Sequence, residues 1–434
     1  MNSTAPLRLA VAGLGTVGAA AVKIIEAKGN ALAVTAGRPI TVTAVAARDR
    51  TRDRGLSLNG VTWFDDAALM AKEAQADVFV ELIGGAEGMA KAAVEAALQA
   101  KKHVITANKA LLAAHGPALA RLAEENGVTI LFEAAVAGGI PVIKALREAL
   151  AGNTVTRVSG ILNGTCNYIL SRMEAEGLTF AECLKAAQEL GYAEADPTFD
   201  VEGFDTAHKL ALLAALAFGS EVDAEAIYVE GISGVTPLDL KMADELGFRI
   251  KLLGVAERTA GGIEQRVHPT MVPKTAQLAQ VMGVLNAVSV QGDVVGELTL
   301  VGPGAGGNAT ASAVLSDIVD LARGTSIATF GKPGSALQKP ERAPMQRHEG
   351  GYYVRLETLD KPGAAATIAT RMAENSISIE SILQKGRGQR ADATSVPVIL
   401  ITYATTESTV RKALDAIAGD GVIMGAPQVI RIER

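Results

Sequence analysis

The densest group of ionisable side chains lies near the middle of the chain. Five carboxylates and one lysine fall within sixteen residues: Glu194, Asp196, Asp200, Glu202, Asp205 and Lys209. If Asp205 and Lys209 share a helix, their spacing of four places them on one face, where the acid can position the amine. A surface ion pair beside a solvated acidic loop has the same spacing. A calcium loop is excluded, because counting from Asp196 the sixth residue is Val201 rather than Gly, and the twelfth is Ala207 rather than Glu.

Three further polar segments could bind a reactant. Lys109 follows a predicted strand at 103–106, so it falls at the carboxyl end of a parallel sheet, where ligands of open α/β sheets bind; a capping or surface lysine is the alternative. Residues 163–165, Asn-Gly-Thr, supply amide and hydroxyl groups at a helix start, or a plain N-cap. Glu133 precedes the irregular segment 136–141, whose open carbonyls could face substrate, water or a hard cation.

A glycine-rich turn opens the first predicted helix. It follows the predicted strand 7–12 directly and consists of Gly13, Leu14, Gly15, Thr16, Val17 and Gly18. The glycines allow a tight turn and the close approach of a pyrophosphate to the helix N-terminus. The same pattern alone is often only a loop, but the strand, the helix and the βα units that follow favour a dinucleotide site.

The end of the second predicted strand decides which dinucleotide is expected. An acid there would bind the ribose 2′-hydroxyl of NAD, whereas a basic residue would bind the 2′-phosphate of NADP. Arg48 is best placed for the phosphate, although a solvated charged turn is an equal alternative and Asp49 keeps NAD open. We expect NADP.

The first 150 residues contain the elements that must position the glycine turn and Lys109. In this region short apolar runs alternate with helical patterns, as in βαβ units. The expected strands are 7–12, 40–46, 78–83, 103–106 and 128–132, and the expected helices are 86–100 and 110–126. This pattern predicts an α/β fold with a Rossmann-type doubly wound parallel sheet in residues 1–150, completed by a late helix at about 306–324 that packs back on it.

The rest of the chain predicts two further units. Residues 151–305 form an inserted α+β domain, with helices at 165–176, 180–190 and 205–218 and strands at 249–257, 263–271 and 286–291. Residues 331–350 contain several prolines and glycines and almost no apolar periodicity, which predicts a linker. Residues 351–434 predict an independently folding ferredoxin-like βαββαβ unit, with strands at 352–358, 377–385, 396–404 and 428–432 and helices at 364–375 and 408–418.

Composition excludes several classes of function. A chain of 434 residues with 49% hydrophobic residues is expected to form two or three cores. A net charge of -6 and 4% aromatic residues disfavour nucleic acid and anionic membranes as partners. Cys166 and Cys183 form no zinc or redox spacing, and Cys166 lacks a neighbouring activating group, so a buried role and a reduced, cytoplasmic location are expected. No apolar run is long enough to span a membrane, and glycines interrupt the one possible signal core.

Several segments together resemble homoserine dehydrogenase of the bacterial type that carries a C-terminal ACT domain. The resemblance spans nearly the whole chain. It rests on the glycine turn, on Thr-Ala-Asn-Lys-Ala at 106–110 and on residues 133–141, 160–170 and 191–209. The last of these contains Asp-Pro-x-x-Asp-x-x-Gly-x-Asp-x-x-x-Lys, and Gly-Pro-Gly-Ala-Gly at 302–306, which contains Gly304, resembles a second cofactor-contacting turn.

This resemblance implies reversible hydride transfer between NAD(P)H and L-aspartate 4-semialdehyde, which gives L-homoserine for threonine and methionine biosynthesis. It implies that Lys209 donates the proton in reduction and accepts it in oxidation. It also implies that Lys109 is a second essential lysine, which lies beside the nicotinamide and the substrate and so helps to bind the cofactor. The substrate-binding positions that it implies are Glu194, Asp200 and Asp205. A monovalent cation such as sodium is expected at Glu133, Val136, Gly138 and Ile140, chiefly through backbone carbonyls.

The resemblance also implies regulation and assembly. An ACT domain at 351–434 commonly holds an amino-acid effector in paired copies, so threonine feedback is expected, with the domain at 151–305 forming a homodimer or homotetramer. Ala364, Ala365 and Ala366 replace the large aliphatic residues usual in such domains, which would suit weak effector binding or a role in association alone. Two other hypotheses remain: a phosphorylating semialdehyde dehydrogenase with a cysteine nucleophile, and an amino-acid sensor with a vestigial dinucleotide fold.

Overall fold

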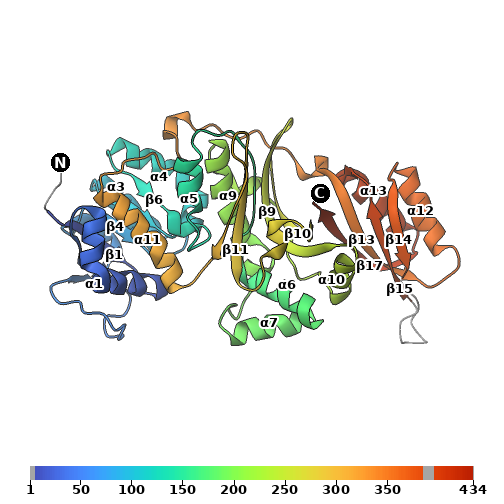
Figure 1. The fold of residues 1–434 in the computed structure, drawn as a ribbon, viewed down its shortest axis with the longest axis horizontal. Coiled ribbons are helices and arrows are strands. Elements are labelled where there is room, and N and C mark those ends of the chain that lie inside the picture. The colour runs from blue at the N-terminus through green and yellow to red at the C-terminus, as the bar shows by residue number, and fades with distance from the viewer. Residues whose placement is uncertain (1–4, 385–394, 434) are drawn as a thin grey trace.

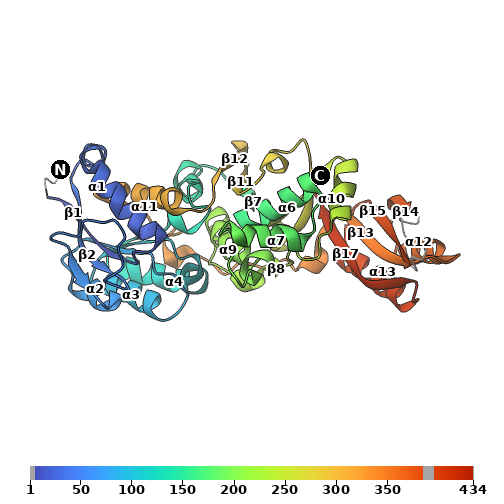
Figure 2. The same cartoon turned by 90° about the horizontal axis from the view of Figure 1, so that it is seen from below.

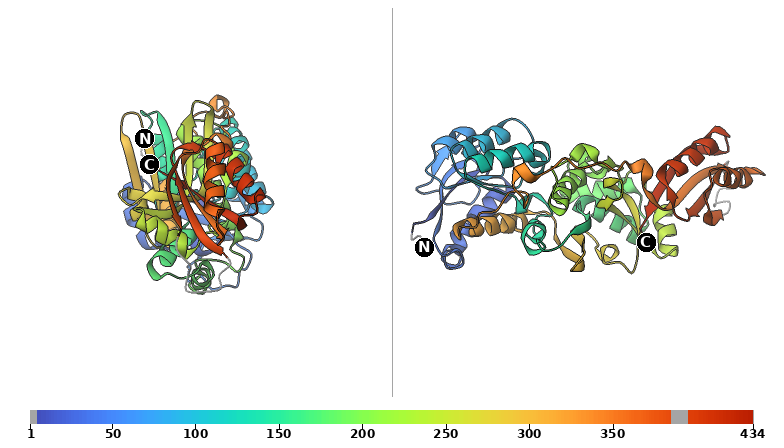
Figure 3. Two further views of the ribbon diagram at one scale, coloured as in Figure 1. Left: turned by 90° about the vertical axis from the view of Figure 1, so that its right-hand side faces the viewer. Right: turned by 90° about the horizontal axis from the view of Figure 1, so that it is seen from above.

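The computed structural model describes residues 5–384 and 395–433. Three parts follow one another along the long axis of the molecule (Figure 1; Figure 3, right). The first contains a six-stranded parallel sheet in the order β3-β2-β1-β4-β5-β6. Its strands are β1 (Leu7–Ala12), β2 (Ile40–Ala46), β3 (Thr62–Phe64), β4 (Val78–Glu81), β5 (His103–Thr106) and β6 (Ile130–Leu131). This order is that of the doubly wound dinucleotide fold, so the predicted fold class is confirmed.

Helices cover both faces of this sheet, because successive residues of its buried strands point to opposite sides. Leu9 and Val11 pack with α1 (Thr16–Ala36) and α11 (Gly307–Ala322), whereas Ala10 and Ala12 face the other core. That core contains α2 (Ala67–Glu73), α3 (Met89–Gln99) and α4 (Lys109–Glu125). Figure 2 shows α1 and α11 side by side on one side of the strands. A helix from far along the sequence thus completes one layer.

The middle part is a mixed sheet with helices on it. Its strands are β7 (Val155–Ile161), β9 (Phe248–Thr259), β10 (Gly262–Pro273), β11 (Leu285–Gly292) and β12 (Gly296–Pro303), in the order β12-β11-β7-β9-β10, with β8 (Tyr228–Val229) beside β10. The helices are α6 (Gly164–Glu176), α7 (Phe180–Glu189), α8 (Thr198–Val201), α9 (Phe204–Phe218) and α10 (Pro237–Glu245). The sequence did not predict β7 or β12, because Ser, Thr, Arg and Gly interrupt their apolar residues.

The third part has the predicted βαββαβ order. It contains β13 (Glu349–Leu359), α12 (Ala364–Glu374), β14 (Ile379–Gln384), β15 (Ser395–Thr402), the short β16 (Thr405–Thr406), α13 (Glu407–Gly419) and β17 (Ile423–Ile432). Its strands lie in the order β17-β13-β15-β14. The predicted end of the second strand, at Lys385, lies outside the described residues.

The last strand joins the third part to the middle part. Thr270 and Met271 of β10 pair in parallel with Arg431 and Ile432 of β17. Among the described residues the two sheets are therefore one sheet of eleven strands, with β8 and β16 branching from β10 and β13 beside the main path. The sequence predicted an independent unit, because a two-residue pairing carries no sequence signal. The segment predicted as a linker also lies against the protein, since Gly334 donates its N–H to the Glu124 carboxylate.

Charged side chains lie buried at this junction. The Arg431 side chain is 2% exposed and forms ion pairs with Glu230, beside β8, and with Glu407, at the start of α13. The Nη2 atom of Arg431 lies 2.6 Å from Glu407 Oε1. One guanidinium therefore links carboxylates of the middle and third parts.

Replacing Arg431 by Met should destabilise the protein strongly. Removing one partner of a buried ion pair typically costs about 3–5 kcal/mol. The lower end of that range is expected here, because Arg411 still pairs with Glu230 and Glu407. Urea unfolding measures the change. Arg371→Met is the matched control, because Arg371 pairs with Asp420 on the surface of the same part and should have little effect. Equal effects of the two substitutions would contradict this account of the junction.

Candidate active site

Asp205 and Lys209 lie one turn apart at the start of α9, as their spacing predicted. Gly203 precedes the helix at a φ of 89°, a conformation that glycine adopts without strain. The Lys209 Nζ atom donates to Asp205 Oδ2 at 2.7 Å and to the Leu162 carbonyl at 2.7 Å. Asp205 is 5% exposed. The pair is therefore largely shielded from water and is not a solvated surface ion pair.

A second lysine reaches the same carboxylate from the first part of the molecule. Lys109 begins α4, and its Nζ atom lies 3.2 Å from Asp205 Oδ1. Asn108 holds this helix start, because its Oδ1 accepts the N–H of Leu111 and its Nδ2 donates to the Gly85 carbonyl. The structure thus brings Lys109, Asp205 and Lys209 together between the two sheets.

The two lysines control the ionisation of Asp205. Although burial raises the pKa of its carboxyl, the charges of Lys209 and Lys109 outweigh burial and hold the pKa well below its usual value. Asp200 behaves in the opposite way, because burial and the nearby Asp205 charge raise its pKa. Its Oδ1 accepts a hydrogen bond from the side-chain amide of Asn163. Two adjacent carboxylates therefore have pKa values shifted in opposite directions, a common property of catalytic sites.

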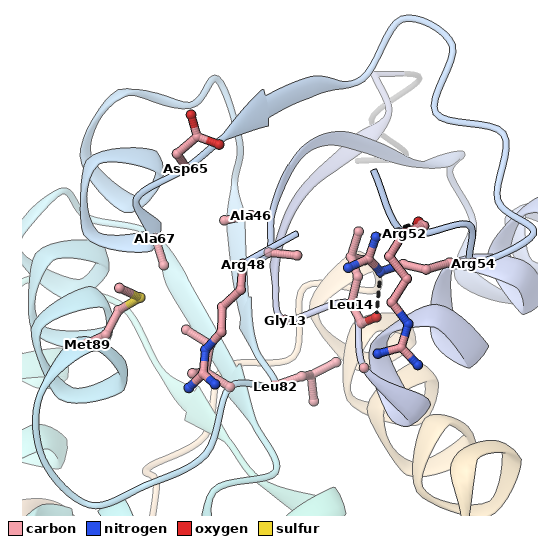
Figure 4. A pocket seen from close by; sticks show the side chains of 13 residues that line it. Gly13, Leu14, Ala46, Arg48, Arg52, Arg54, Asp65, Ala67, Leu82 and Met89 are labelled. Atoms are coloured by element: carbon pink, nitrogen blue, oxygen red, sulfur yellow. Dashed lines mark hydrogen bonds between the residues drawn. The ribbon is translucent and has the colours of Figure 1, made fainter. Parts of the chain in front are cut away.

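The predicted glycine turn forms one wall of a pocket of about 350 Å³ at the carboxyl ends of β1 and β2 (Figure 4). A Cβ atom on Gly13, whose φ is 98°, would lie 2.3 Å from the Leu82 carbonyl oxygen, and one on Gly18 would lie 1.9 Å from the Gly13 oxygen. Gly15 faces open space. Gly13 and Gly18 are thus required for the packing of the turn, and Gly15 leaves the pocket wall clear for a phosphate.

Comparisons with known proteins agree with this geometry. A family model described as "Homoserine dehydrogenase, NAD binding domain" matches residues 13–133, and one described as "Homoserine dehydrogenase" matches residues 141–319. The chain is 43% identical to the homoserine dehydrogenase of Neisseria gonorrhoeae and 45% identical to that of Pseudomonas aeruginosa, over 99% of each chain. The chain belongs to the homoserine dehydrogenase family. The predictions of this family and of an oxidoreductase are confirmed.

Solved structures support the same family. A homoserine dehydrogenase from Thiobacillus denitrificans superposes with a TM-score of 0.92 at 42% identity, covering 99% of this chain and 98% of that one. A hyperthermophilic archaeal homoserine dehydrogenase in complex with NADPH has a TM-score of 0.64 at 27% identity, covering 75% of this chain and 100% of that one. The match of the NAD-binding model adds that the first part of this homoserine dehydrogenase family member takes a nicotinamide dinucleotide.

Three arginines of this family member line the pocket. Figure 4 shows Arg48 on one side of Gly13 and Arg52 and Arg54 on the other. Asp49 does not line the pocket, and its Oδ1 accepts the N–H of Thr51 at 2.8 Å within its own turn. Among the described residues, Asp65 is the one carboxylate in the pocket wall. The wall is therefore basic overall.

The second predicted turn lies beside the first. A Cβ atom on Gly307 would be 3.1 Å from Thr16, and one on Gly138 would be 2.5 Å from the Gly304 carbonyl oxygen. Gly304 itself leaves no room for a side chain, because a Cβ atom there would meet the Asn286 amide at 2.0 Å. The turn around Gly304 therefore lies between the dinucleotide turn and residues 136–141, the segment predicted to bind a cation.

That segment has an irregular backbone with open oxygen atoms. Ala137 and Gly138 adopt φ angles of 55° and 45°. Within the described residues, the carbonyl oxygens of Val136 and Gly138 accept no hydrogen bond, whereas that of Ile140 accepts the N–H of Val142. Unpaired carbonyl oxygens suit a hard cation.

Glu133 is buried at the same segment, and its carboxylate accepts the N–H groups of Ile143 and Lys144. Burial and the neighbouring Asp317 raise its pKa to about 7. Each Glu133 oxygen keeps a free lone pair, so these contacts leave it able to bind a cation.

Glu194 stands apart from the other predicted residues. Its side chain is exposed, and no described hydrogen bond or ion pair links its carboxylate to the two lysines. Sequence reasoning missed Tyr192 in the same loop, whose carbonyl accepts the Thr165 hydroxyl and whose ring packs edge-on against Tyr168 at 5.2 Å. The only signal for Tyr192 was its place inside the matched motif.

Cys166 is buried, and its surroundings favour the neutral thiol. Burial raises the pKa of its thiol well above the usual value, and its Sγ atom donates to the Asp200 carbonyl. A thiol held in its neutral form is a poor nucleophile. This geometry argues against the phosphorylating dehydrogenase. Among the described residues, no helix could cross a membrane.

Proposed function

We propose that this enzyme catalyses the reversible reduction of L-aspartate 4-semialdehyde to L-homoserine with a nicotinamide dinucleotide. The observation that carries the proposal is the meeting of Lys109 and Lys209, from two parts of the molecule, at the single buried carboxylate of Asp205. A vestigial dinucleotide fold in an amino-acid sensor has no need for this arrangement. The family supports the same reaction.

Lys209 is the proton donor in reduction and the acceptor in oxidation. When bound, the nicotinamide supplies the hydride to the aldehyde carbon or takes it from the alcohol carbon. Alkoxide charge then develops on the substrate oxygen, where the Lys209 ammonium stabilises it and transfers a proton to it. Asp205 holds Lys209 at 2.7 Å. Lys109 adds a second positive charge beside the reacting oxygen.

The substrate's own charges find complementary groups around this site. At the first turn of α6, Asn163 Oδ1 accepts the Cys166 N–H, and the N–H groups that precede Cys166 are suited to the α-carboxylate. Asp200 and the exposed Glu194 supply negative charge for the α-ammonium group. Glu194 lies on the loop before α8 and has to approach the substrate from there.

Lys209→Ala should lose about 100- to 10,000-fold in kcat for homoserine oxidation, the usual contribution of a general acid or base. Its affinity for the dinucleotide, measured by fluorescence titration, should not change. Lys185→Ala is the matched control, because Lys185 is an exposed lysine on α7 of the same part. Near-normal turnover by Lys209→Ala would remove Lys209 from the chemistry.

We propose that NADP is the preferred dinucleotide, with Arg48 at its 2′-phosphate. Three observations support this proposal: the basic pocket wall, the hydrogen bond that occupies Asp49 within its own turn, and the NADPH complex of the archaeal relative. Arg48→Ala should raise the KM for NADP at least tenfold and leave that for NAD nearly unchanged. Arg50→Ala removes an adjacent arginine that does not line the pocket and should change neither. A wild-type preference for NAD would contradict the proposal.

We propose that a monovalent cation such as sodium binds to oxygen atoms of Glu133, Val136, Gly138 and Ile140. The bound cation would hold residues 136–141 against the turn at Gly304 and so keep the dinucleotide near the middle part. Replacing sodium by choline at constant ionic strength should raise the KM for NADP and leave Lys209 chemistry intact. An unchanged KM would contradict the cation site.

We propose that the division of labour along the chain follows the sequence prediction: residues 1–150 with the helix at 306–324 bind the dinucleotide, 151–305 carry catalysis and dimerisation, 331–350 connect, and 351–434 form a regulatory ACT domain. Threonine is the proposed effector and a homodimer or homotetramer the proposed assembly, in a reducing cytoplasm. The βαββαβ order of the third part supports the ACT assignment. Titration of the activity with threonine is the direct test.

A further inference from the structure

Asn163 lies between the two carboxylates of the proposed active site. It is the last residue before α6, and it is 5% exposed. Its Nδ2 atom donates to Asp200 Oδ1 at 2.8 Å and to Asp205 Oδ2 at 2.9 Å. Its Oδ1 atom accepts the Cys166 N–H at 2.8 Å. The sequence could not distinguish this role from that of an ordinary N-cap.

Chemistry fixes the orientation of this amide. Only Oδ1 can accept the Cys166 N–H, and only Nδ2 can donate to carboxylates. The reversed orientation would place the amide oxygen against two negative charges and the NH2 group against an N–H. The helix cap therefore directs both amide hydrogens into the site, one to each carboxylate.

The Asn163 amide also determines which partners each carboxylate oxygen of Asp205 contacts. Asn163 and Lys209 both bind Oδ2, which leaves Oδ1 facing Lys109. Rotation of the Asp205 carboxylate would break contacts with both lysines. Asn163 adds a neutral constraint against that rotation, because its own position is set by the cap and by the end of β7.

The backbone around Asn163 is tightly placed. The carbonyl of the preceding residue, Leu162, is the second acceptor for Lys209 Nζ. A Cβ atom on the following residue, Gly164, would lie 2.8 Å from the Val284 carbonyl oxygen, so the chain passes close to the loop before β11. Two consecutive residues thus hold Lys209 and Asp205 from one fixed segment.

We propose that Asn163 is a positioning residue for proton transfer: its amide bridges Asp200 and Asp205 and holds the Asp205 carboxylate in the orientation that engages Lys209 and Lys109 together. This role rests on the proposed function. It acts through Asp205 and not by contact with the substrate. Loss of the amide therefore alters the proton equilibrium and kcat more than dinucleotide binding.

Two substitutions separate this role from capping. Asn163→Ser and Asn163→Asp both keep a favoured N-cap residue. Serine is too short to reach both carboxylates, and aspartate replaces the two donors by a third negative charge. Thr179→Ala is the matched control, because it removes the N-cap of α7 in the same part of the protein.

The first measurement needs no substrate. Competitive labelling of the full-length protein with acetic anhydride across pH, read by peptide mass spectrometry, gives the titration midpoint of each lysine. Asn163→Ser should lower the midpoint of Lys209, because an Asp205 carboxylate that is free to turn away stabilises the ammonium form less. Lys185 should not shift, and Thr179→Ala should move neither lysine. An unshifted Lys209 would overturn the proposal.

The second measurement is the pH profile of homoserine oxidation. Asn163→Ser should lower kcat about tenfold or more with the affinity for NADP unchanged, and it should move the pH limb for the proton acceptor downward. Asn163→Asp also lacks the amide donors and should not restore kcat. A wild-type kcat in Asn163→Ser would overturn the proposal. So would a loss of activity that matches the loss of folded protein and leaves the pH profile unshifted. If wild-type enzyme fails to oxidise homoserine, the proposed function fails, and the labelling result still decides the role of Asn163.

Discussion

Two lysines sharing one buried carboxylate are the interaction on which the rest of the structure depends. Asp205 is buried, and its negative charge is sustained there chiefly by Lys209 and Lys109, at 2.7 and 3.2 Å, with a hydrogen bond from Asn163. Lys209 comes from the same helix, but Lys109 comes from the first part of the molecule. The ion pair therefore requires the end of the dinucleotide-binding sheet to meet the start of α9.

Backbone proximity around the pocket satisfies that requirement. Gly138 and Gly304 occupy points where two chain segments pass too closely for a side chain, and a Cβ atom on Gly307 would lie 3.1 Å from Thr16. The Gly304 turn leads into α11, which packs on α1 beside the dinucleotide turn. The chain therefore passes from the first part to the middle part and back again. These two connections place the dinucleotide pocket next to the two lysines.

Local sequence predicted most of the first part and much of the site. The bounds of β1, β2 and β5 match the prediction, because each strand ends in a buried, mainly apolar run. The pairing of Asp205 with Lys209 followed from helical spacing alone. The bridge made by Asn163 did not, because it joins residues up to 42 positions apart, and a side chain that caps a helix has the same local pattern whatever its other atoms touch.

The charged junction between the middle and third parts explains how so short a strand pairing is specified. Only two residues of β17 pair with β10, and apolar packing alone would specify their register weakly. A slip by one residue would turn Arg431 to the other face of the sheet and leave the half-buried carboxylate of Glu230 and the buried carboxylate of Glu407 without it. An apolar junction of the same size would be as stable, but it would lack that penalty. The ion pairs therefore contribute register more than stability, and they hold the third part in one position against the catalytic sheet.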